Sequence, residues 1–280
     1  MREIAVHTVR EAVKELCIES NLYLPSDVKC ALERSLSSEK NPRATIVLDK
    51  ILQNVDIAQN EQLPLCQDTG MLVVFLEIGQ DVHFVGGGLT EAIQSGVEDG
   101  YRDGFLRKSI VADPLERVNT KTNTPAVIYT DIVEGDAVKI IVAPKGFGSE
   151  NMSRIQMCRP SDGAEGIKHF IVESVRLADA NPCPPIVVGV GIGSTFEGCA
   201  LLAKKALLRP LDAKNENPFY AKMEEELLET INGLNIGPQG FGGETTALGV
   251  NILAFPTHIA GMPVAVNISC HVARHKERIL

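Results

Sequence analysis

The sequence predicts an α/β protein in which mixed sheets with antiparallel hairpins are flanked by helices, after a helical N-terminal segment over residues 1–60. Apolar residues recur at helical spacing throughout that segment. Strand-like apolar runs then alternate with amphipathic helical runs over the rest of the chain. Because there is no repeat, low-complexity tract or linker, we expect one domain over residues 1–280.

In the N-terminal segment, helices are expected over residues 4–16, 28–36 and 46–55. Ser26 and Asp27 can cap the second helix, and Asn41 followed by Pro42 suits the start of the third. A strand over 71–78, a Gly86-Gly87-Gly88 turn and a helix over about 90–103 come next. The β-rich runs 126–133 and 137–142 are separated by Glu134-Gly135-Asp136, which indicates a hairpin.

The second half of the chain continues the alternation. Helices are expected over residues 166–180, 196–209 and 218–232, and strands over 186–190, 247–255 and 264–269, with a glycine-rich loop over 237–243. The glycines between Val187 and Ser194 alternate and lack the Gly-x-Gly-x-x-Gly spacing of dinucleotide sites. We therefore favour a tight strand-to-helix turn over a nucleotide site, with its N–H groups available to an anion.

Composition excludes several classes of protein. The 280 residues are 44% hydrophobic, and no apolar run reaches the roughly 20 residues of a membrane-spanning helix, so we expect no membrane partner. A net charge of −9 and the absence of Trp speak against nucleic-acid binding. The N-terminus has no secretory pattern, and an odd number of cysteines without paired spacing favours a reducing compartment. The expected location is the cytoplasm.

Three of the seven cysteines lie in short polar or proline-rich bends, namely Cys66, Cys183 and Cys270. Three widely separated thiolates can converge on one metal cluster and leave one of its positions open, which suits an iron–sulfur cluster used as a Lewis acid. The alternative is that a cysteine serves as a small buried hydrophobic residue, which is the commonest role of a free thiol. We assign that role to Cys17, Cys30 and Cys199 and favour it for Cys158, and spacing alone leaves it open for the other three.

Several charged or polar residues lie near these bends. Lys145 opens a Lys-Gly-Phe-Gly-Ser loop whose N–H groups can approach a carboxylate, although an ordinary loop has the same features. His258 precedes Cys270 by twelve residues, and a hairpin between them can carry both to one end of a sheet. Arg107 is by default a solvated cation. His271, Arg274 and His275 are expected in an exposed tail.

Together, the motifs Leu-Pro-Leu-Cys66-Gln-Asp-Thr-Gly, Gly86-Gly-Gly, Arg107, Val118-Asn-Thr, Lys145-Gly-Phe-Gly-Ser, Cys183-Pro-Pro and Cys270 resemble the class I, iron–sulfur-dependent fumarate hydratases and L(+)-tartrate dehydratases. The chain looks like the separate α subunit of the two-subunit form. The resemblance implies a [4Fe–4S] cluster held by Cys66, Cys183 and Cys270, with one iron not bound by protein. It also implies substrate contacts from Gln67, Asp68, Arg107, the Gly148 backbone and His258, with catalytic roles for His258 and Asp68.

The same resemblance implies an α2β2 assembly with a β subunit that carries the remaining catalytic residues, since this chain ends at Leu280 before the family's C-terminal portion. The expected reaction is reversible hydration of fumarate to (S)-malate, a step of the tricarboxylic acid cycle, on a small dicarboxylate substrate. L(+)-tartrate dehydration to oxaloacetate is the nearest alternative. A coordinatively saturated redox or sensing protein and a metal-free binding module are the alternatives from other classes.

Overall fold

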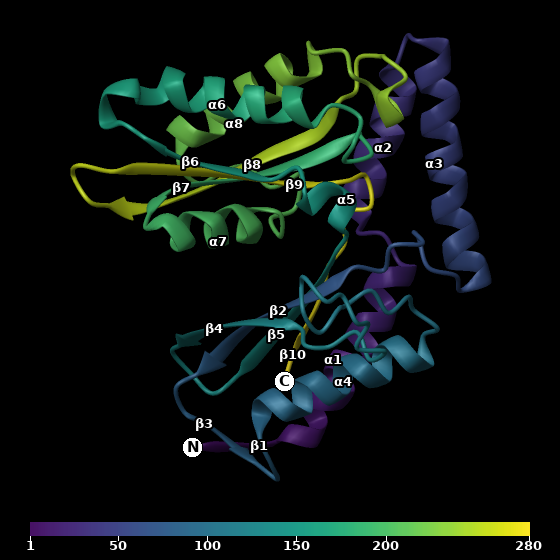
Figure 1. Cartoon of the computed structure of the whole chain (residues 1–280), viewed down its shortest axis with the longest axis vertical. Coiled ribbons are helices and arrows are strands. Elements are labelled where there is room, and N and C mark those ends of the chain that lie inside the picture. Colours follow the sequence, from purple (N-terminus) through teal and green to yellow (C-terminus); the bar gives the residue numbers. More distant parts are fainter. The chain divides into compact units, whose positions relative to one another are not determined.

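The computed structural model describes residues 1–280 and divides by contacts into two compact units (Figure 1). Unit 1 comprises residues 1–24, 55–147 and 274–280, and unit 2 comprises residues 25–54 and 148–273. Both are mixed α/β, which confirms the predicted fold class. The single domain over 1–280 stays a prediction. No helix is long and apolar enough to cross a membrane.

Unit 1 contains a four-stranded mixed sheet covered on one face by two helices. Its elements are β1 (Arg2–Ala5), α1 (Val6–Leu22), β2 (Met71–Gly79), β3 (Val82–Val85), α4 (Leu89–Asp103), β4 (Val127–Val133), β5 (Val138–Lys145) and β10 (Lys276–Ile279). The sheet order is β10-β5-β2-β4, and β1 pairs separately with β3 in parallel. Val13 of α1, Tyr101 of α4 and Leu72 of β2 belong to one buried core between helices and sheet.

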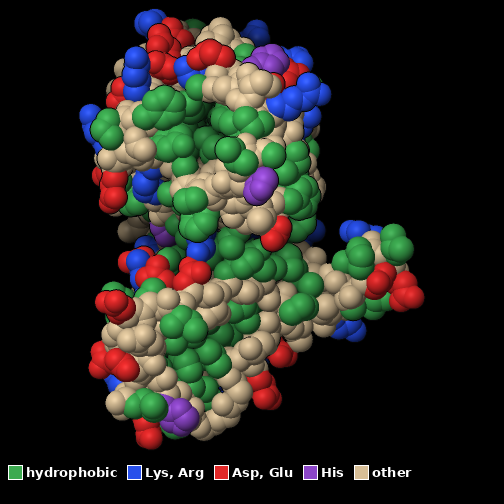
Figure 2. Space-filling view, turned by 90° about the vertical axis from the view of Figure 1, so that its left-hand side faces the viewer, with side chains coloured by type: hydrophobic (Ala, Val, Ile, Leu, Met, Phe, Trp, Pro, Cys, Tyr) green, Lys and Arg blue, Asp and Glu red, His purple; other side chains and the backbone are tan.

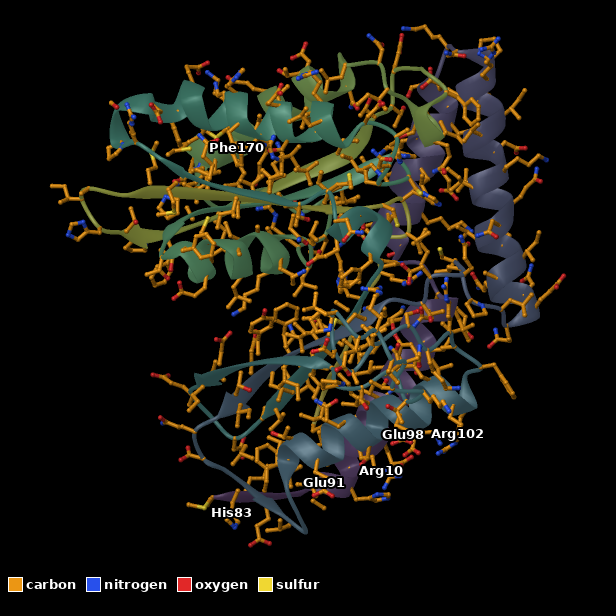
Figure 3. The ribbon with its side chains drawn as sticks, in the orientation of Figure 1. Arg10, His83, Glu91, Glu98, Arg102 and Phe170 are labelled. Carbon is orange, nitrogen blue, oxygen red and sulfur yellow. The ribbon has the colours of Figure 1, made fainter.

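The outward side of these helices is charged. Arg10, Glu91, Glu98 and Arg102 lie along the solvent side of α1 and α4 (Figure 3). Arg10 and Arg102 both pair with Asp99, at 2.5 and 2.9 Å. The contrast between this face and the apolar inner face explains why the amphipathic pattern predicted these helices.

Unit 2 contains a second four-stranded sheet, with helices on both faces (Figure 1). Its elements are α2 (Ser26–Ser38), most of α3 (Pro42–Glu61), α5 (Phe147–Glu150), β6 (Arg154–Cys158), η1 (Pro160–Asp162), α6 (Gly163–Ala178), β7 (Ile186–Ser194), α7 (Phe196–Ala206), α8 (Pro218–Asn232), η2 (Pro238–Gly240), β8 (Ala247–Thr257) and β9 (Met262–Ser269). The sheet order is β6-β9-β7-β8. Phe170 of α6 is buried between that helix and the sheet (Figure 3), in the core that α6 and α8 share.

The predicted hairpin over residues 126–142 does not form. β4 pairs in parallel and β5 pairs antiparallel with the same strand, β2, which lies between them. The link between β4 and β5 crosses the end of β2, where Gly79 N–H donates to Ala137 O at 2.9 Å. Strands on either side of a central strand are about 10 Å apart, a gap that four residues span, so a short link does not prove direct pairing.

β8 and β9 repeat this arrangement around β7, which is parallel to β8 and antiparallel to β9. Antiparallel pairing is therefore present, as predicted, but β4 and β5, like β8 and β9, lie on either side of an inner strand and do not pair with each other. The short strands β1, β3, β6 and β10 have only four or five residues each and were not predicted.

The three N-terminal helices are confirmed as α1, α2 and α3. Asn41 caps α3 as predicted, because its Oδ1 accepts the Arg43 N–H at 3.0 Å. Ser26 and Asp27 do not cap α2, whose N-cap is Pro25. The Asp27 carboxylate instead accepts the Leu211 N–H at 2.9 Å and so fastens α2 to a distant loop.

The alternating glycines near residue 190 are explained by close packing of α7 on β7. A Cβ at Gly189 would lie 2.2 Å from the Ala203 carbonyl oxygen, and one at Gly191 would lie 2.2 Å from that of Cys199. The predicted tight turn follows them, where Gly193 and Ser194 have φ of 89° and 63°. Helix–strand packing and this turn therefore account for the run without a nucleotide site.

Candidate metal and substrate site

The cysteines separate by burial. Cys66 and Cys270 are half-buried and Cys183 is exposed, whereas Cys17, Cys158 and Cys199 are buried as predicted. Burial raises the pKa of the Cys17 and Cys158 thiols, and raises that of Cys199 to about 12. A buried thiol with a raised pKa stays protonated and inert as a ligand. The buried role predicted for Cys30 is wrong, because Cys30 is exposed on α2.

In unit 1, Cys66 lies in the loop between α3 and β2, and Asp68 organises this loop. The Cys66 sulfur accepts the Asp68 N–H at 3.4 Å and lies 3.7 Å from Gln67 Oε1. The Asp68 carboxylate accepts the N–H groups of Gly70 at 3.0 Å and Phe147 at 2.9 Å. One carboxylate therefore joins the Cys66 loop to the loop that begins at Lys145.

The same loop rests on buried polar groups from α4 and from the segment after it. The Tyr101 hydroxyl lies 2.7 and 3.0 Å from the carbonyl oxygens of Thr69 and Gly70, and burial raises its pKa well above the usual range. Asn123 Nδ2 donates to Gly70 O at 3.1 Å. These bonds satisfy the carbonyls that a buried loop would otherwise leave unpaired.

Two arginines approach the Cys66 loop in different ways. The Arg107 carbonyl accepts the Thr69 hydroxyl at 2.9 Å, while its guanidinium is exposed and makes no ion pair. Arg274 is only 7% exposed, and its Nη2 donates to the Asp68 carbonyl oxygen at 2.5 Å. Its Nε is buried without a hydrogen-bond partner.

The prediction that Arg274 lies in an exposed tail is therefore wrong. The short strand β10 follows it and pairs antiparallel with β5, which draws the segment into unit 1. Buried Val272 and Ala273 just before it were the available signal, but a two-residue apolar run is too short to predict burial.

In unit 2, the structure brings the Cys183 bend and the end of β9 together. Cys183 has a φ of 55°, and its N–H donates to Ala180 O at 3.1 Å. Ser269, which precedes Cys270, pairs with Val187 near the start of β7. His271 then contacts the Cys183 carbonyl oxygen through its N–H at 3.5 Å and its Nδ1 at 3.0 Å.

Gly148 also lies beside the Cys183 bend, since a Cβ built on it would be 3.9 Å from the Asn181 carbonyl oxygen. Its short helix α5 is fixed through Glu150. That carboxylate pairs with Lys204 Nζ at 2.6 Å and accepts Asn267 Nδ2 at 2.9 Å. Asn267 belongs to β9, so the backbone around Gly148 is tied to the strand that leads to Cys270.

His258 lies elsewhere in unit 2, in the exposed link between β8 and β9, where its Nδ1 accepts the Ala260 N–H at 3.2 Å. The eight residues of β9 separate this link from Cys270, roughly 25 Å at about 3.3 Å per residue. The prediction that a hairpin carries both residues to one end of the sheet is wrong. Figure 2 shows hydrophobic side chains at this end of unit 2, where Phe255 is 59% and Ile259 is 90% exposed.

Two cavities lie away from these residues. In unit 1, a cavity of about 260 Å³ is lined by the Gly86–Gly88 loop with His7, Arg10 and Glu91. In unit 2, a cavity of about 230 Å³ lies beside Arg209, Glu224 and Asn251, and the Arg209 guanidinium donates to both of the others. Neither cavity is lined by a predicted site residue.

The donor chemistry fits an iron–sulfur cluster. None of the seven cysteines forms a disulfide, and Cys66, Cys183 and Cys270 each sit at a loop or strand end with some exposure. Thiolates are the ligands such clusters use. No group of three or more His, Cys, Asp or Glu side chains is gathered around a single point in the structure, and Cys66 belongs to a different unit from Cys183 and Cys270.

Comparisons with known proteins show which family the chain belongs to. A protein of Methanocaldococcus jannaschii provisionally named L(+)-tartrate dehydratase subunit alpha is 43% identical over 272 residues, which cover 95% of each chain. The L(+)-tartrate dehydratase subunit alpha of Escherichia coli K12 is 32% identical over 277 residues, covering 98% of this chain and 91% of the relative. The family model described as fumarate hydratase (Fumerase) matches residues 10–279. The chain therefore belongs to the fumarate hydratase (Fumerase) family.

Proposed function

We propose that this chain is the α subunit of an iron–sulfur hydro-lyase that hydrates fumarate to (S)-malate reversibly. The observation that carries the proposal is the division of the cysteines. The three in the family-type motifs have accessible sulfurs at loop or strand ends, while Cys17, Cys158 and Cys199 are buried among apolar side chains. Family membership over nearly the whole chain supports the same reading.

In this proposal, Cys66, Cys183 and Cys270 hold a [4Fe–4S] cluster with one iron not bound by protein. The cluster supplies a Lewis acid that polarises the substrate C–O bond. Because Cys66 is in unit 1 and the other two are in unit 2, the proposal requires both units of the chain.

The chain's own residues bind and orient the substrate. Arg107 suits a substrate carboxylate, because its exposed guanidinium is a planar fork without a protein partner and its backbone is anchored by Thr69. Gln67 offers an exposed amide next to Cys66, and the Gly148 backbone lies beside the Cys183 bend. Both can hold carboxylate or hydroxyl oxygens.

Asp68 and His258 are the proposed catalytic residues, and the structure bears on each differently. The Asp68 carboxylate already accepts two backbone N–H groups, so its first effect is to fix the loop that carries Cys66 and Gln67. An oxygen has a second lone pair, so this carboxylate can still accept a substrate proton. His258 lies at the opposite end of β9 from Cys270, so it is not beside the Cys183 bend of its own unit. Its proposed catalytic role therefore requires that it meet the substrate away from that bend.

L(+)-tartrate is the second candidate substrate, because both relatives described above carry that name. Their names also include "subunit alpha", which supports a β partner. The α2β2 stoichiometry is part of the proposal. The odd number of cysteines without paired spacing supports a cytoplasmic, reducing location.

The test is kinetic. Anaerobic kcat/KM should be measured on malate, fumarate and L(+)-tartrate with and without the β subunit. We expect turnover only with β, and at least tenfold preference for one substrate pair. Full turnover by the isolated chain would contradict the need for β, and no turnover of any substrate by the complex would contradict the hydro-lyase.

A further inference from the structure

Within unit 2, the carbonyl groups of Cys183 and Pro184 are both occupied by residues far away in the sequence. Pro184 O accepts the Gln239 backbone N–H at 2.7 Å and the Gln239 side-chain Nε2 at 2.8 Å. Cys183 O contacts His271 Nδ1 at 3.0 Å. Because a carbonyl oxygen only accepts, His271 Nδ1 must carry a proton to make this bond.

Gln239 also lies 3.3 Å from His271 Nδ1, so the two residues contact each other as well as the cysteine bend. His271 directly follows Cys270. The Cys183 carbonyl is therefore hydrogen-bonded directly to the residue that follows Cys270, and Gln239, which binds the Pro184 carbonyl, contacts the same histidine, without any contribution from a metal.

The loop that presents Gln239 is built for this position. Gln239 adopts a left-handed conformation with φ 53° and ψ 20°, which is unusual for a residue with a side chain. Gly240 after it permits close packing, because a Cβ there would lie 2.4 Å from the Ala180 side chain at the start of the bend. The glycine-rich loop over 237–243, which had no role in the proposed mechanism, therefore packs directly against the Cys183 bend.

We propose that Gln239 and His271 form a clamp, meaning a pair of positioning residues that hold Cys183 and Cys270 in a two-thiolate geometry before a metal centre binds. This inference rests on the proposed function for its biological purpose, but the clamp itself acts on the protein without a cluster. Groups that orient metal ligands in this way commonly contribute about 10–100-fold to metal affinity.

The variant Gln239→Met keeps the length of the side chain and removes its N–H donors. Gln94→Met is the control, because the Gln94 side chain makes two hydrogen bonds with the Ala126 backbone but belongs to unit 1. Gln239→Met loses one side-chain hydrogen bond, to Pro184 O, and the contact with His271, so its loss of thermal stability should not exceed that of Gln94→Met.

The first readout uses the full-length chain without a cluster and a trivalent arsenical that bridges two neighbouring thiols, with the bridged peptides identified by mass. Wild type and Gln94→Met should bridge Cys183 to Cys270, and Gln239→Met should bind the arsenical about 10–100-fold more weakly. Equal affinity in all three proteins would overturn the clamp.

The second readout is the rate of iron loss to a chelator after anaerobic reconstitution. Gln239→Met should lose iron at least tenfold faster than Gln94→Met, with a changed visible circular dichroism spectrum. If wild type bridges the arsenical but binds no iron, the clamp stands and the proposed function fails. If wild type binds iron and Gln239→Met retains it equally well, the clamp fails alone.

A third variant guards against simple unfolding. His271→Ala leaves the glycine-rich loop unchanged and removes the contact with the Cys183 carbonyl. It should weaken arsenical binding in the same way, and the double variant should add little to either single change because both act on one network. Additive losses would contradict a shared clamp.

Discussion

Unit 1 and unit 2 both lead a cysteine-bearing loop into the central strand of a four-stranded mixed sheet, but they hold that loop by different means. Cys66 precedes β2 and Cys183 precedes β7, and each of these strands has a parallel neighbour on one side and an antiparallel neighbour on the other. In unit 1 the loop is held by the half-buried Asp68 carboxylate and by the buried side chains of Tyr101 and Arg274. In unit 2 it is held by Gln239 and His271.

The comparison also relates the three proposed thiol donors to the topology of the two sheets. β5 and β9 are the antiparallel neighbours in the two sheets, and they end opposite the starts of β2 and β7. At that end, unit 2 has Cys270, one residue beyond β9, whereas unit 1 has Lys145, which pairs with Met71. The doubled topology offers four comparable strand-end positions, and a lysine occupies the fourth.

The largest expected effect separates the strand-end cysteines from the others. Cys66→Ser, Cys183→Ser and Cys270→Ser should each lose nearly all iron after reconstitution, because an oxygen donor is a poor substitute for thiolate in such clusters. Cys30→Ser is the control with an exposed thiol on a helix and should retain all of its iron. If iron analysis showed that Cys30→Ser loses as much iron as the other three variants, the distinction between the strand-end cysteines and the helical cysteine would be contradicted.

A second effect tests the packing of the Cys66 loop. Gly70 has a φ of 79°, and a Cβ there would lie 2.8 Å from Lys145 N, so Gly70→Ala should lower the free energy of unfolding by about 2–4 kcal/mol. Gly135 has a φ of 99° but open space around it, so Gly135→Ala should cost only about 1–2 kcal/mol. Urea unfolding measures both, and equal losses would show that the close approach to Lys145 is unimportant.

The two arginines beside the Cys66 loop, Arg107 and Arg274, should affect different properties when they are replaced. Arg107→Met should raise the substrate KM by about 10–100-fold, because it removes one charged hydrogen-bonded contact with a substrate carboxylate. Thermal stability should not change, because the Arg107 guanidinium is exposed. Arg117→Met, at another exposed position in the same unit, is the control and should leave KM unchanged.

Arg274→Met should instead loosen the Cys66 loop, because it removes the bond to the Asp68 carbonyl. In the chain without a cluster, Cys66 should then react faster with iodoacetamide, while Cys30 reacts at an unchanged rate. Identical Cys66 rates in Arg274→Met and wild type would show that the buried guanidinium does not fix the loop.

The smallest effect concerns the buried thiols. Burial raises the folded-state pKa of the Cys199 thiol to about 12, above its ordinary value of 9.0. Its contribution to stability is therefore complete below about pH 9 and is lost as the pH rises towards 12, because the unfolded chain releases the proton first. Cys199→Ala should flatten the alkaline fall in unfolding free energy, and Cys30→Ala should leave it unchanged.

Local patterns predicted much of this fold and part of its site. Helical periodicity located α1, α4 and α8, and the polar bends singled out the three candidate ligands. The strand pairing could not be predicted from the sequence, because a four-residue link can join β4 to β5 whether the two strands pair directly or lie on either side of β2. Gln239, His271 and Arg274 act through contacts across 32 to 206 residues, and nothing in their sequence neighbourhood reports such partners.

The most direct test of the central claim is anaerobic iron and sulfide analysis with electron paramagnetic resonance, on the reconstituted complex with the β subunit, before and after addition of malate. We predict about four irons per chain and a spectrum that shifts when substrate binds, since one iron is open to it. A full cluster with no spectral change on adding malate, fumarate or tartrate would indicate a saturated cluster, and absence of iron would reduce Cys66, Cys183 and Cys270 to structural residues.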